Sequence, residues 1–238
     1  MNRWYPVARS EELVPRHIAQ TQLLGQEIAL WRDDAGAVNA WENRCPHRGV
    51  RLSIGSNTGT DLRCRYHGFR FAAGSGRCNF IPAHPSQKPA GSMHAVVYAA
   101  VERYRYVCVS LDPRTDEPEL PMPGNAAATS LRSIFVEAPA AAVVDQLSRG
   151  YRIDAATEAV LTGEDHFTLT AAAGSGERAQ VVLFLLQPVT QTQTVIHALL
   201  CPAAAAADRL AVLRHHNAQM TMLRDAVERS CAAAKRRA

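Results

Sequence analysis

Two short segments of the chain each pair a cysteine with a histidine at a spacing that suits metal binding. The first, residues 45–49, reads Cys-Pro-His-Arg-Gly, and the second, residues 64–68, reads Cys-Arg-Tyr-His-Gly. Sixteen residues separate His47 from Cys64. Each segment therefore offers one thiolate and one imidazole, which are ligands for zinc and for iron–sulfur centres.

The division of the ligands indicates which metal centre is expected. In a Rieske-type [2Fe–2S] cluster, one iron takes two cysteines and the other takes two histidines, and the neutral imidazoles make the cluster easier to reduce. Zinc also accepts two cysteines and two histidines, but zinc knuckles pair like ligands close together, whereas each segment here is mixed. A chance alignment of buried residues is the third alternative. The sequence favours a [2Fe–2S] cluster bound by Cys45, His47, Cys64 and His67.

Glycine closes both segments, at Gly49 and Gly68. Because glycine adopts positive φ and admits close backbone approach, both positions suit a loop that folds around a cluster. The elements that carry these loops are expected to be strands. Short apolar runs recur between turn-rich separators, at Glu27–Arg32, Ala37–Glu42, Asp61–Cys64, Phe69–Ala72, Ala95–Tyr98 and Tyr106–Leu111. Residues 1–112 are therefore predicted to form a small all-β antiparallel sandwich.

A proline-rich stretch, residues 113–123, resists helix and central strand and is predicted to be a linker. Residues 124–238 show a mixed pattern, so the fold class is α+β. Helices are expected at Ala140–Arg149 and from about Asp208 to Ala234, and strands at His166–Ala172, Ala179–Leu186 and Thr192–Leu200. The last helix has one apolar face, formed by Leu210, Leu213, Met220, Leu223, Val227 and Cys231.

The composition, with 47% hydrophobic and 20% charged residues in 238, is that of a soluble globular protein. No apolar run is long enough to span a membrane, and the N-terminus lacks a secretory signal, so a cytoplasmic location is expected. Six cysteines then indicate metal ligands or free thiols rather than disulfides. The four without a histidine at ligand spacing are expected to be buried or inert thiols, namely Cys78, Cys108, Cys201 and Cys231.

The formal charge is +4, and residues 41–80 hold seven arginines against only Glu42 and Asp61. This basic stretch is either a solvated face or a docking patch for an acidic redox partner. Nucleic acid is not expected as a partner, because no recognition motif accompanies the arginines.

The first half of the chain closely resembles the N-terminal domain of Rieske non-haem iron oxygenases, particularly the vanillate O-demethylase-like branch. Besides the two ligand segments, the resemblance includes residues 4–8 (Trp-Tyr-Pro-Val-Ala), 24–25 (Leu-Gly), 76–77 (Gly-Arg) and 81–82 (Ile-Pro). The extra cysteines of respiratory Rieske proteins are replaced by Val50 and Tyr66.

Three residues depart from the oxygenase pattern. Phe69 stands where tryptophan is usual, while Arg105 and Cys108 replace the usual glycine and tryptophan. None of the three is expected to touch the cluster ligands.

The resemblance implies that the second half is a small helix-grip-like α+β domain, which in the family binds one iron through two histidines and a carboxylate. In this chain the positions of the two iron histidines fall at Arg152 and Thr157, and that of the relaying aspartate falls at Arg149. A guanidinium stays protonated and cannot bind iron. The domain is also shorter than in the family. We expect a shortened, degenerate catalytic domain, and we hypothesise that Arg149 and Arg152 replace the charge of the missing metal.

Other residues could rebuild an iron site. Asp225 could match the third ligand, although a solvent-facing aspartate is the favoured interpretation. His166 and His197, with Asp165 nearby, lie on predicted strands, but such histidines are more often surface or satisfied core residues. His215 and His216 are adjacent on a helix and cannot both serve one metal. We therefore predict no mononuclear iron.

The sequence thus favours a Rieske [2Fe–2S] electron-transfer or accessory component of a multi-subunit oxygenase. The family resemblance implies a reductase or ferredoxin as electron donor and a catalytic oxygenase subunit as partner, in a trimer-like homo- or hetero-oligomer. One alternative is a terminal oxygenase, a monooxygenase or demethylase acting on a small aromatic or methylated compound. Another is a zinc-stabilised binding module with no redox role.

Overall fold

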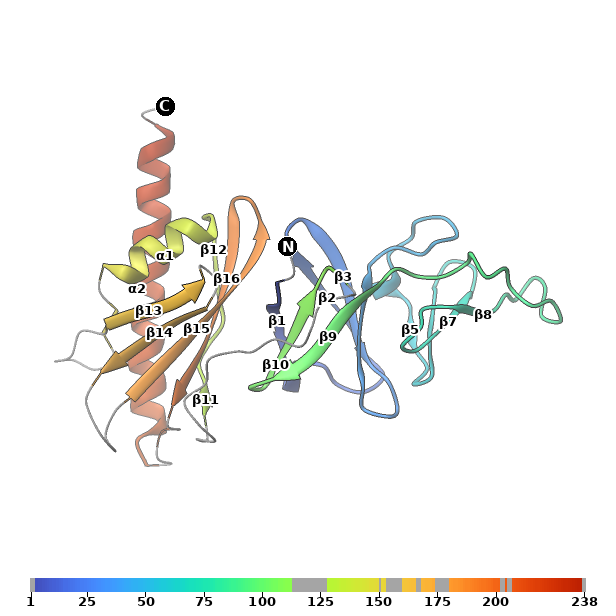
Figure 1. Cartoon of the computed structure of the whole chain (residues 1–238), viewed down its shortest axis with the longest axis horizontal. Coiled ribbons are helices and arrows are strands. Elements are labelled where there is room, and N and C mark those ends of the chain that lie inside the picture. The colour runs from blue at the N-terminus through green and yellow to red at the C-terminus, as the bar shows by residue number, and fades with distance from the viewer. Residues whose placement is uncertain are drawn as a thin grey trace. The chain divides into compact units, whose positions relative to one another are not determined.

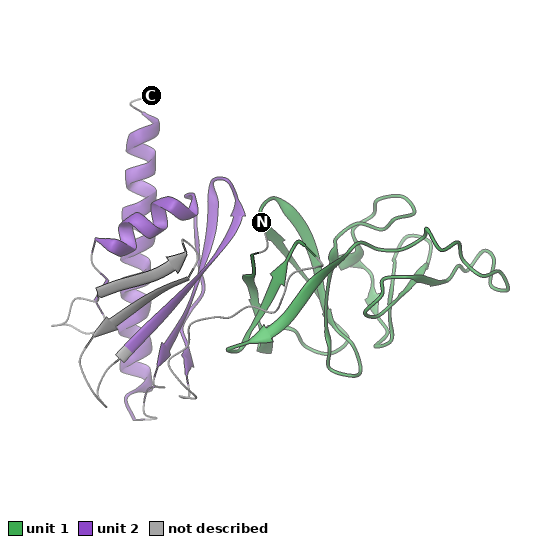
Figure 2. Cartoon of the chain, viewed as in Figure 1, with its two compact units in different colours: residues 1–118 green, residues 119–238 purple. Residues whose placement is uncertain are grey.

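The computed structural model describes residues 3–112, 128–149, 151–152, 160–165, 168–173, 180–201, 204 and 207–236, and for residues 160–165, 168–173 and 180 it describes the backbone alone. The chain divides into two compact units, residues 1–118 and 119–238 (Figure 2). The predicted linker, residues 113–123, lies outside the described residues. No helix in the described ranges is long and apolar enough to cross a membrane.

A six-stranded antiparallel sheet forms the larger part of the first unit, with strand order β1-β10-β9-β4-β3-β2 (Figure 1). The strands are β1 (Tyr5–Arg9), β2 (Ile18–Leu23), β3 (Gln26–Arg32), β4 (Val38–Glu42), β9 (Val97–Arg103) and β10 (Tyr106–Ser110). Aromatic residues on β3 and β4 anchor its core, because Trp31 and Trp41 are fully buried and meet edge to face with centroids 5.2 Å apart.

Four short strands form a second antiparallel sheet in the order β5-β6-β7-β8. They are β5 (Ser56–Asn57), β6 (Asp61–Arg63), β7 (Arg70–Ala72) and β8 (Cys78–Phe80). The first ligand segment follows β4 of the large sheet, whereas the second joins β6 to β7 of the small sheet. Two short 3₁₀ turns complete the unit, Ser10–Glu12 and Leu52–Ile54.

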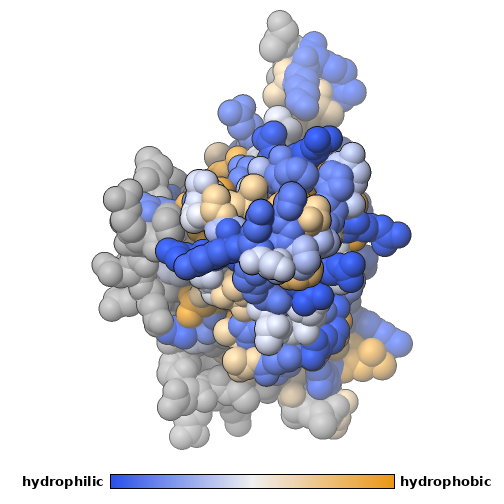
Figure 3. All heavy atoms as spheres, turned by 90° about the vertical axis from the view of Figure 1, so that its right-hand side faces the viewer, coloured by the Kyte–Doolittle hydropathy of each residue, from blue (hydrophilic) through white to orange (hydrophobic). Residues whose placement is uncertain are grey.

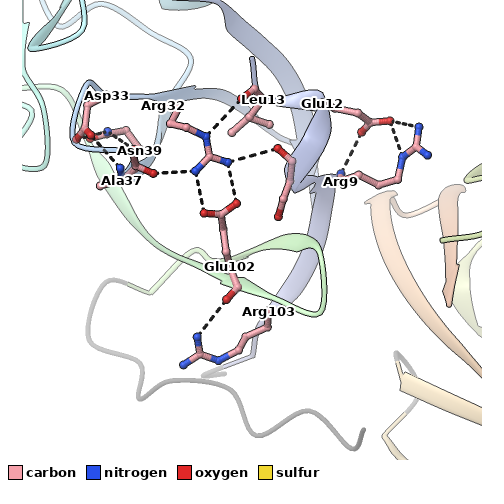
Figure 4. Close-up of polar contacts among 11 residues, drawn as sticks. Arg9, Glu12, Leu13, Arg32, Asp33, Ala37, Asn39, Glu102 and Arg103 are labelled. Atoms are coloured by element: carbon pink, nitrogen blue, oxygen red, sulfur yellow. Dashed lines mark hydrogen bonds and ion pairs between the residues drawn. The ribbon is translucent and has the colours of Figure 1, made fainter. Parts of the chain in front are cut away.

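A half-buried ion pair crosses the large sheet from β3 to β9 (Figure 4). The Arg32 guanidinium donates to both carboxylate oxygens of Glu102 at 2.8 and 2.7 Å, and it also reaches the carbonyl oxygens of Ser10, Leu13 and Gly36. The hydrogen bonds from Arg32 hold the pKa of Glu102 below its ordinary value. Arg32 on β3 therefore connects the residues after β1 to strand β9.

The second unit is a curved antiparallel sheet with two helices (Figure 1). The strand order is β11-β16-β15-β14-β13, and β12 pairs with β16. The strands are β11 (Thr129–Ser130), β12 (Ile134–Val136), β13 (Val160–Asp165), β14 (Thr168–Ala173), β15 (Gln180–Thr190) and β16 (Gln193–Cys201). The helices are α1 (Ala140–Ser148) and α2 (Arg209–Lys235).

Alternate residues of β15 and β16 form the core of this unit with the two helices, as the two-residue period of a strand requires. The strand side chains are Val182, Phe184, Leu186, Ile196, Ala198 and Leu200, and the helices add Val143, Leu147, Met220, Leu223 and Val227. The apolar face predicted for the last helix is confirmed in its middle, but the prediction is wrong for Leu210, which is 59% exposed.

The α+β class predicted from the sequence is confirmed, and so are the strands β3, β4, β6, β7, β10, β14, β15 and β16, to within two residues at every end but the last of β15. The run predicted at Ala95–Tyr98 overlaps only the start of β9. Sequence reasoning did not identify β1, β2, β5, β8, β11, β12 and β13. Most of these strands are short, or their sequences lack the alternation of apolar and polar residues that is typical of a strand.

Candidate iron–sulfur site

The two ligand segments adopt the same backbone turn. In the first, the Cys45 amide donates to the carbonyl of Val50 at 2.8 Å, and the Gly49 amide donates to the carbonyl of Cys45 at 2.8 Å. In the second, the Cys64 amide donates to Phe69 at 2.9 Å, and the Gly68 amide donates to Cys64 at 3.1 Å. Each cysteine thus starts a turn that a glycine closes four residues later.

Positive backbone angles explain the glycines. Gly49 has φ +73° and Gly68 has φ +70°, which is the left-handed region that other residues enter at a cost. A Cβ at Gly49 would lie 3.1 Å from Nε of Arg44, and one at Gly68 would lie 3.6 Å from Nε of Arg63. The residue before each cysteine is therefore an arginine whose guanidinium lies against the closing glycine of its own loop.

The two predicted histidine ligands face each other. Nδ1 of His47 lies 3.1 Å from Nδ1 of His67, and the ring centroids are 4.9 Å apart. Two imidazoles that direct the same kind of nitrogen at one point can bind a single metal ion between them. The structure thus brings together from different sheets the histidines that the sequence placed 20 residues apart.

Each histidine ring also contacts an aromatic side chain. Phe69 stacks on His47 with centroids 4.5 Å apart, and Tyr66 lies 3.8 Å from His67. The expectation that Phe69 does not touch the ligands is therefore wrong. The Phe69 side chain is buried in the same apolar cluster as Cys45 and Cys64, which brings its ring to the ligand loops.

The two predicted cysteine ligands lie in the core of the first unit. Cys45 and Cys64 are 3% and 2% exposed, and both pack in one apolar cluster with Trp31, Trp41, Leu52, Leu62 and Phe71. Burial, together with the neighbouring Cys64, raises the pKa of the Cys45 thiol to about 11. Such thiols become thiolates when a cation binds them. Burial, and then the charges of His67 and Arg48, lower the pKa of His47, which favours the neutral imidazole that metals bind.

These donors fit a [2Fe–2S] cluster. Two buried thiols supply one pair of ligands, and two partly exposed imidazoles supply the other. None of the six cysteines forms a disulfide. Of the four that are not predicted ligands, Cys78, Cys108 and Cys201 are buried, as expected, and Cys231 is partly exposed.

Histidines of the second unit are engaged within its core. His197 is 4% exposed, with Nδ1 2.8 Å from the Ser133 hydroxyl and Nε2 3.0 Å from Oε1 of Gln187. His216 is 1% exposed and lies 2.7 Å through Nδ1 from the Tyr151 hydroxyl. Both are satisfied core histidines. For His197 this is one of the two interpretations that the sequence favoured, whereas for His216 the sequence predicted only that it does not share a metal with His215. Of the other candidates, Thr157 and His166 lie outside the described residues, and Asp165 is described by its backbone alone.

The remaining candidates of the second unit lie at its surface. The Asp225 side chain is 43% exposed and pairs with Arg224 at 3.0 Å. Arg149 pairs with Asp145 at 2.7 Å, with both side chains more than 60% exposed, and Arg152 is exposed. The hypothesis that Arg149 and Arg152 replace the charge of the missing metal is therefore wrong for Arg149, whose charge an exposed ion pair already neutralises. For Arg152 it stays a hypothesis.

Several neighbours of the ligands were not identified from the sequence, namely the ring contacts of Phe69 and Tyr66 and the packing of Arg44 and Arg63. A signal for the arginines was present. Arg44 and Arg63 each precede a cysteine by one residue and a glycine by five, so the two segments repeat one pattern.

Comparison with protein families matches residues 3–103 to the Rieske [2Fe-2S] domain. Among curated proteins, the chain is 42% identical over 151 residues to oxidoreductase NdmD of Pseudomonas putida, which covers 62% of this chain and 26% of that protein. It is 48% identical over 80 residues to 4beta-methylsterol monooxygenase of Methylococcus capsulatus, covering 34% and 21%. The chain spans about a quarter of the length of the curated relatives it matches.

Two solved structures show how far the fold is shared. The structure of Pseudomonas putida CBB5 NdmA, a mutant with theobromine, superposes with a TM-score of 0.79 and 17% identity over 94% of this chain and 80% of that chain. Dicamba monooxygenase bound to dicamba gives a TM-score of 0.77 and 19% identity over 99% and 90%. At this low sequence identity, the similarity shows a shared fold and nothing more.

Proposed function

Because residues 3–103 form a Rieske [2Fe–2S] domain on a chain related to the Rieske non-haem iron oxygenases, we propose that this protein is an electron-transfer or accessory component of a multi-subunit oxygenase. Cys45 and Cys64 would hold one iron of the cluster, and His47 and His67 would hold the other. The approach of the two histidine Nδ1 atoms to 3.1 Å carries this assignment. When bound, the cluster accepts and donates one electron at a time.

The two ends of the site differ in their exposure to water. The apolar cluster around the two cysteines keeps water from one side. On the other side, the exposed His67 and the half-exposed His47 bring the site to the surface. An electron therefore enters and leaves through the imidazole edge.

The second unit is proposed to lack a mononuclear iron site. The positions that resemble the iron histidines hold Arg152 and Thr157, and His197 and His216 have core partners of their own. Of the two relatives described above, the one matched over more of this chain is named an oxidoreductase and not an oxygenase. A reductase or ferredoxin would supply electrons, and a catalytic subunit in a trimer-like ring would receive them.

The fold shared with dicamba monooxygenase and NdmA favours a second candidate, a terminal oxygenase acting on a small aromatic or methylated compound. Metal and sulfide analysis of the anaerobically purified chain, with EPR of its reduced form, separates the candidates. A carrier contains two irons and two sulfides per chain, whereas an oxygenase contains a third iron. Zinc without sulfide would overturn both and leave a structural module.

A further inference from the structure

Among the arginines of the first unit, two sets differ in how their charge is compensated. Five are held by carboxylates: Arg9 by Glu12, Arg16 by Asp34, Arg32 by Glu102, Arg51 by Glu27, and Arg105 by Glu11. Four others, which we call the loop arginines, are Arg44, Arg48, Arg63 and Arg65. All four are exposed, and none has a carboxylate partner among the described residues. Each is directly next to a proposed cluster ligand in the sequence.

Three of the loop arginines, Arg44, Arg48 and Arg63, have neighbours in the ligand loops. The guanidinium groups of Arg44 and Arg63 lie over the closing glycines of the two loops. Beside the first loop is a hollow of about 350 Å³, whose lining includes His47, Arg44, Arg48 and one carboxylate, Glu42. Glu42 forms no ion pair among the residues that the structure describes, so it offsets one of the four charges from a distance.

The surface around these arginines is polar, with an aromatic side chain beside the histidines. On the face that Figure 3 shows, hydrophilic residues dominate and hydrophobic ones are scattered. Tyr66 is 54% exposed and lies against His67. Exposed tyrosine and arginine are the residues enriched at protein interfaces, where an aromatic contact is surrounded by charge. Positive charge without internal partners also attracts a negatively charged protein and speeds its encounter.

We propose that the loop arginines and Tyr66 form the docking surface for an acidic electron-transfer protein, which exchanges electrons with the cluster across His47 and His67. The proposal rests on the proposed function of the same site. In the exchange one electron passes from the reduced partner, which is oxidised, to the oxidised cluster, which is reduced, and no bond forms or breaks.

The test uses the full chain with its cluster and, as probe, a reduced plant-type [2Fe–2S] ferredoxin, an acidic protein whose potential of about −400 mV lies below the Rieske range. Stopped-flow absorbance gives the second-order rate of electron transfer. We expect the double variant Arg48→Gln/Arg65→Gln to slow it roughly ten-fold at low ionic strength, and the difference to vanish near about 1 M salt.

The matched control is Arg16→Gln/Arg105→Gln, which removes the same net charge from two exposed arginines that have carboxylate partners. We expect this control to keep the wild-type rate. Calorimetric binding of oxidised ferredoxin to the oxidised chain should weaken in the loop variant alone, which separates docking from any change in cluster potential.

Equal slowing in both double variants would overturn the proposal, because net charge alone would then explain the rate. A wild-type rate in the loop variant would overturn it too, while an intact EPR signal would leave the electron-carrier function standing. Absence of a cluster in the wild-type chain would instead refute the proposed function. Binding of a DNA duplex that is lost in the loop variant, with an unchanged ferredoxin rate, would assign the surface to nucleic acid and overturn the proposal.

Discussion

The Tyr151 hydroxyl lies 2.7 Å from Nδ1 of His216, inside the core of the second unit. The two rings are nearly parallel, at 7°, and Phe184 of β15 meets the Tyr151 ring edge to face at 4.7 Å. A buried polar contact therefore connects helix α2 to Tyr151, which follows α1 in the chain. Burial and the adjacent His215 lower the pKa of His216 to about 4.

This contact predicts a pH dependence of stability. The folded-state pKa of His216 lies below its ordinary 6.5, so the unfolded chain binds more protons between these values. The stabilisation is complete above pH about 6.5 and is lost as the pH falls toward 4, by an amount on the order of 2 kcal/mol. Urea unfolding of wild type and His216→Gln between pH 4 and 7 should show a steeper loss in wild type. The control His84→Gln, an exposed histidine, should follow wild type, and parallel curves for all three would contradict the prediction.

Gly68 and Gly74 offer a matched test of crowding in the second ligand loop. Both have nearly the same φ, +70° and +69°, but a Cβ at Gly68 would lie 3.0 Å from Cγ of Pro82, whereas one at Gly74 meets nothing within 4 Å. Alanine at either position should cost about 1 kcal/mol for its backbone, and Gly68→Ala roughly 1 kcal/mol more for packing. Chemical denaturation measures both. Equal costs would show that only the backbone angle requires glycine at position 68.

Arg105 occupies a backbone conformation that suits glycine. It follows Tyr104 in the two-residue turn between β9 and β10, with φ values of 68° and 50°, as in a type I′ hairpin. Arg105→Gly should relieve about 1 kcal/mol of strain and lose an exposed ion pair with Glu11 worth about 0.5 kcal/mol. A small net gain in thermal stability is expected. Arg105→Ala loses the ion pair without the relief, so an alanine variant as stable as the glycine variant would refute the explanation.

His197 is predicted to serve packing and not metal binding. His197→Leu leaves the Ser133 hydroxyl and the Gln187 side chain without their contact to the ring, which should cost about 1–3 kcal/mol. Iron per chain should stay at the wild-type value, whereas His47→Ala should remove the cluster. Unfolding curves and iron analysis measure the two effects. Loss of iron in His197→Leu with the EPR signal of the cluster retained would reveal a second iron site.

The ligand segments could be proposed from the sequence because their chemistry is local. A cysteine, a histidine and a closing glycine within five residues define each loop, and the apolar runs of β3, β4 and β10 reveal the strands around them. Contacts that depend on the turn itself could not be foreseen. The ring of Phe69 meets His47 across two loops, and the pairing of Tyr151 with His216 joins residues 65 positions apart. β1 contains Pro6 and β2 contains Gln20 and Gln22, so neither shows a clear strand period.

The first ligand segment follows the large sheet and the second belongs to the small one, which has a consequence for assembly. With the proposed ligands, neither sheet alone carries a complete set, so iron and sulfide would be captured only after the two sheets have met. Once captured, they would lock the sheets together as a cross-link, and chelation would loosen the domain as well as abolish its colour.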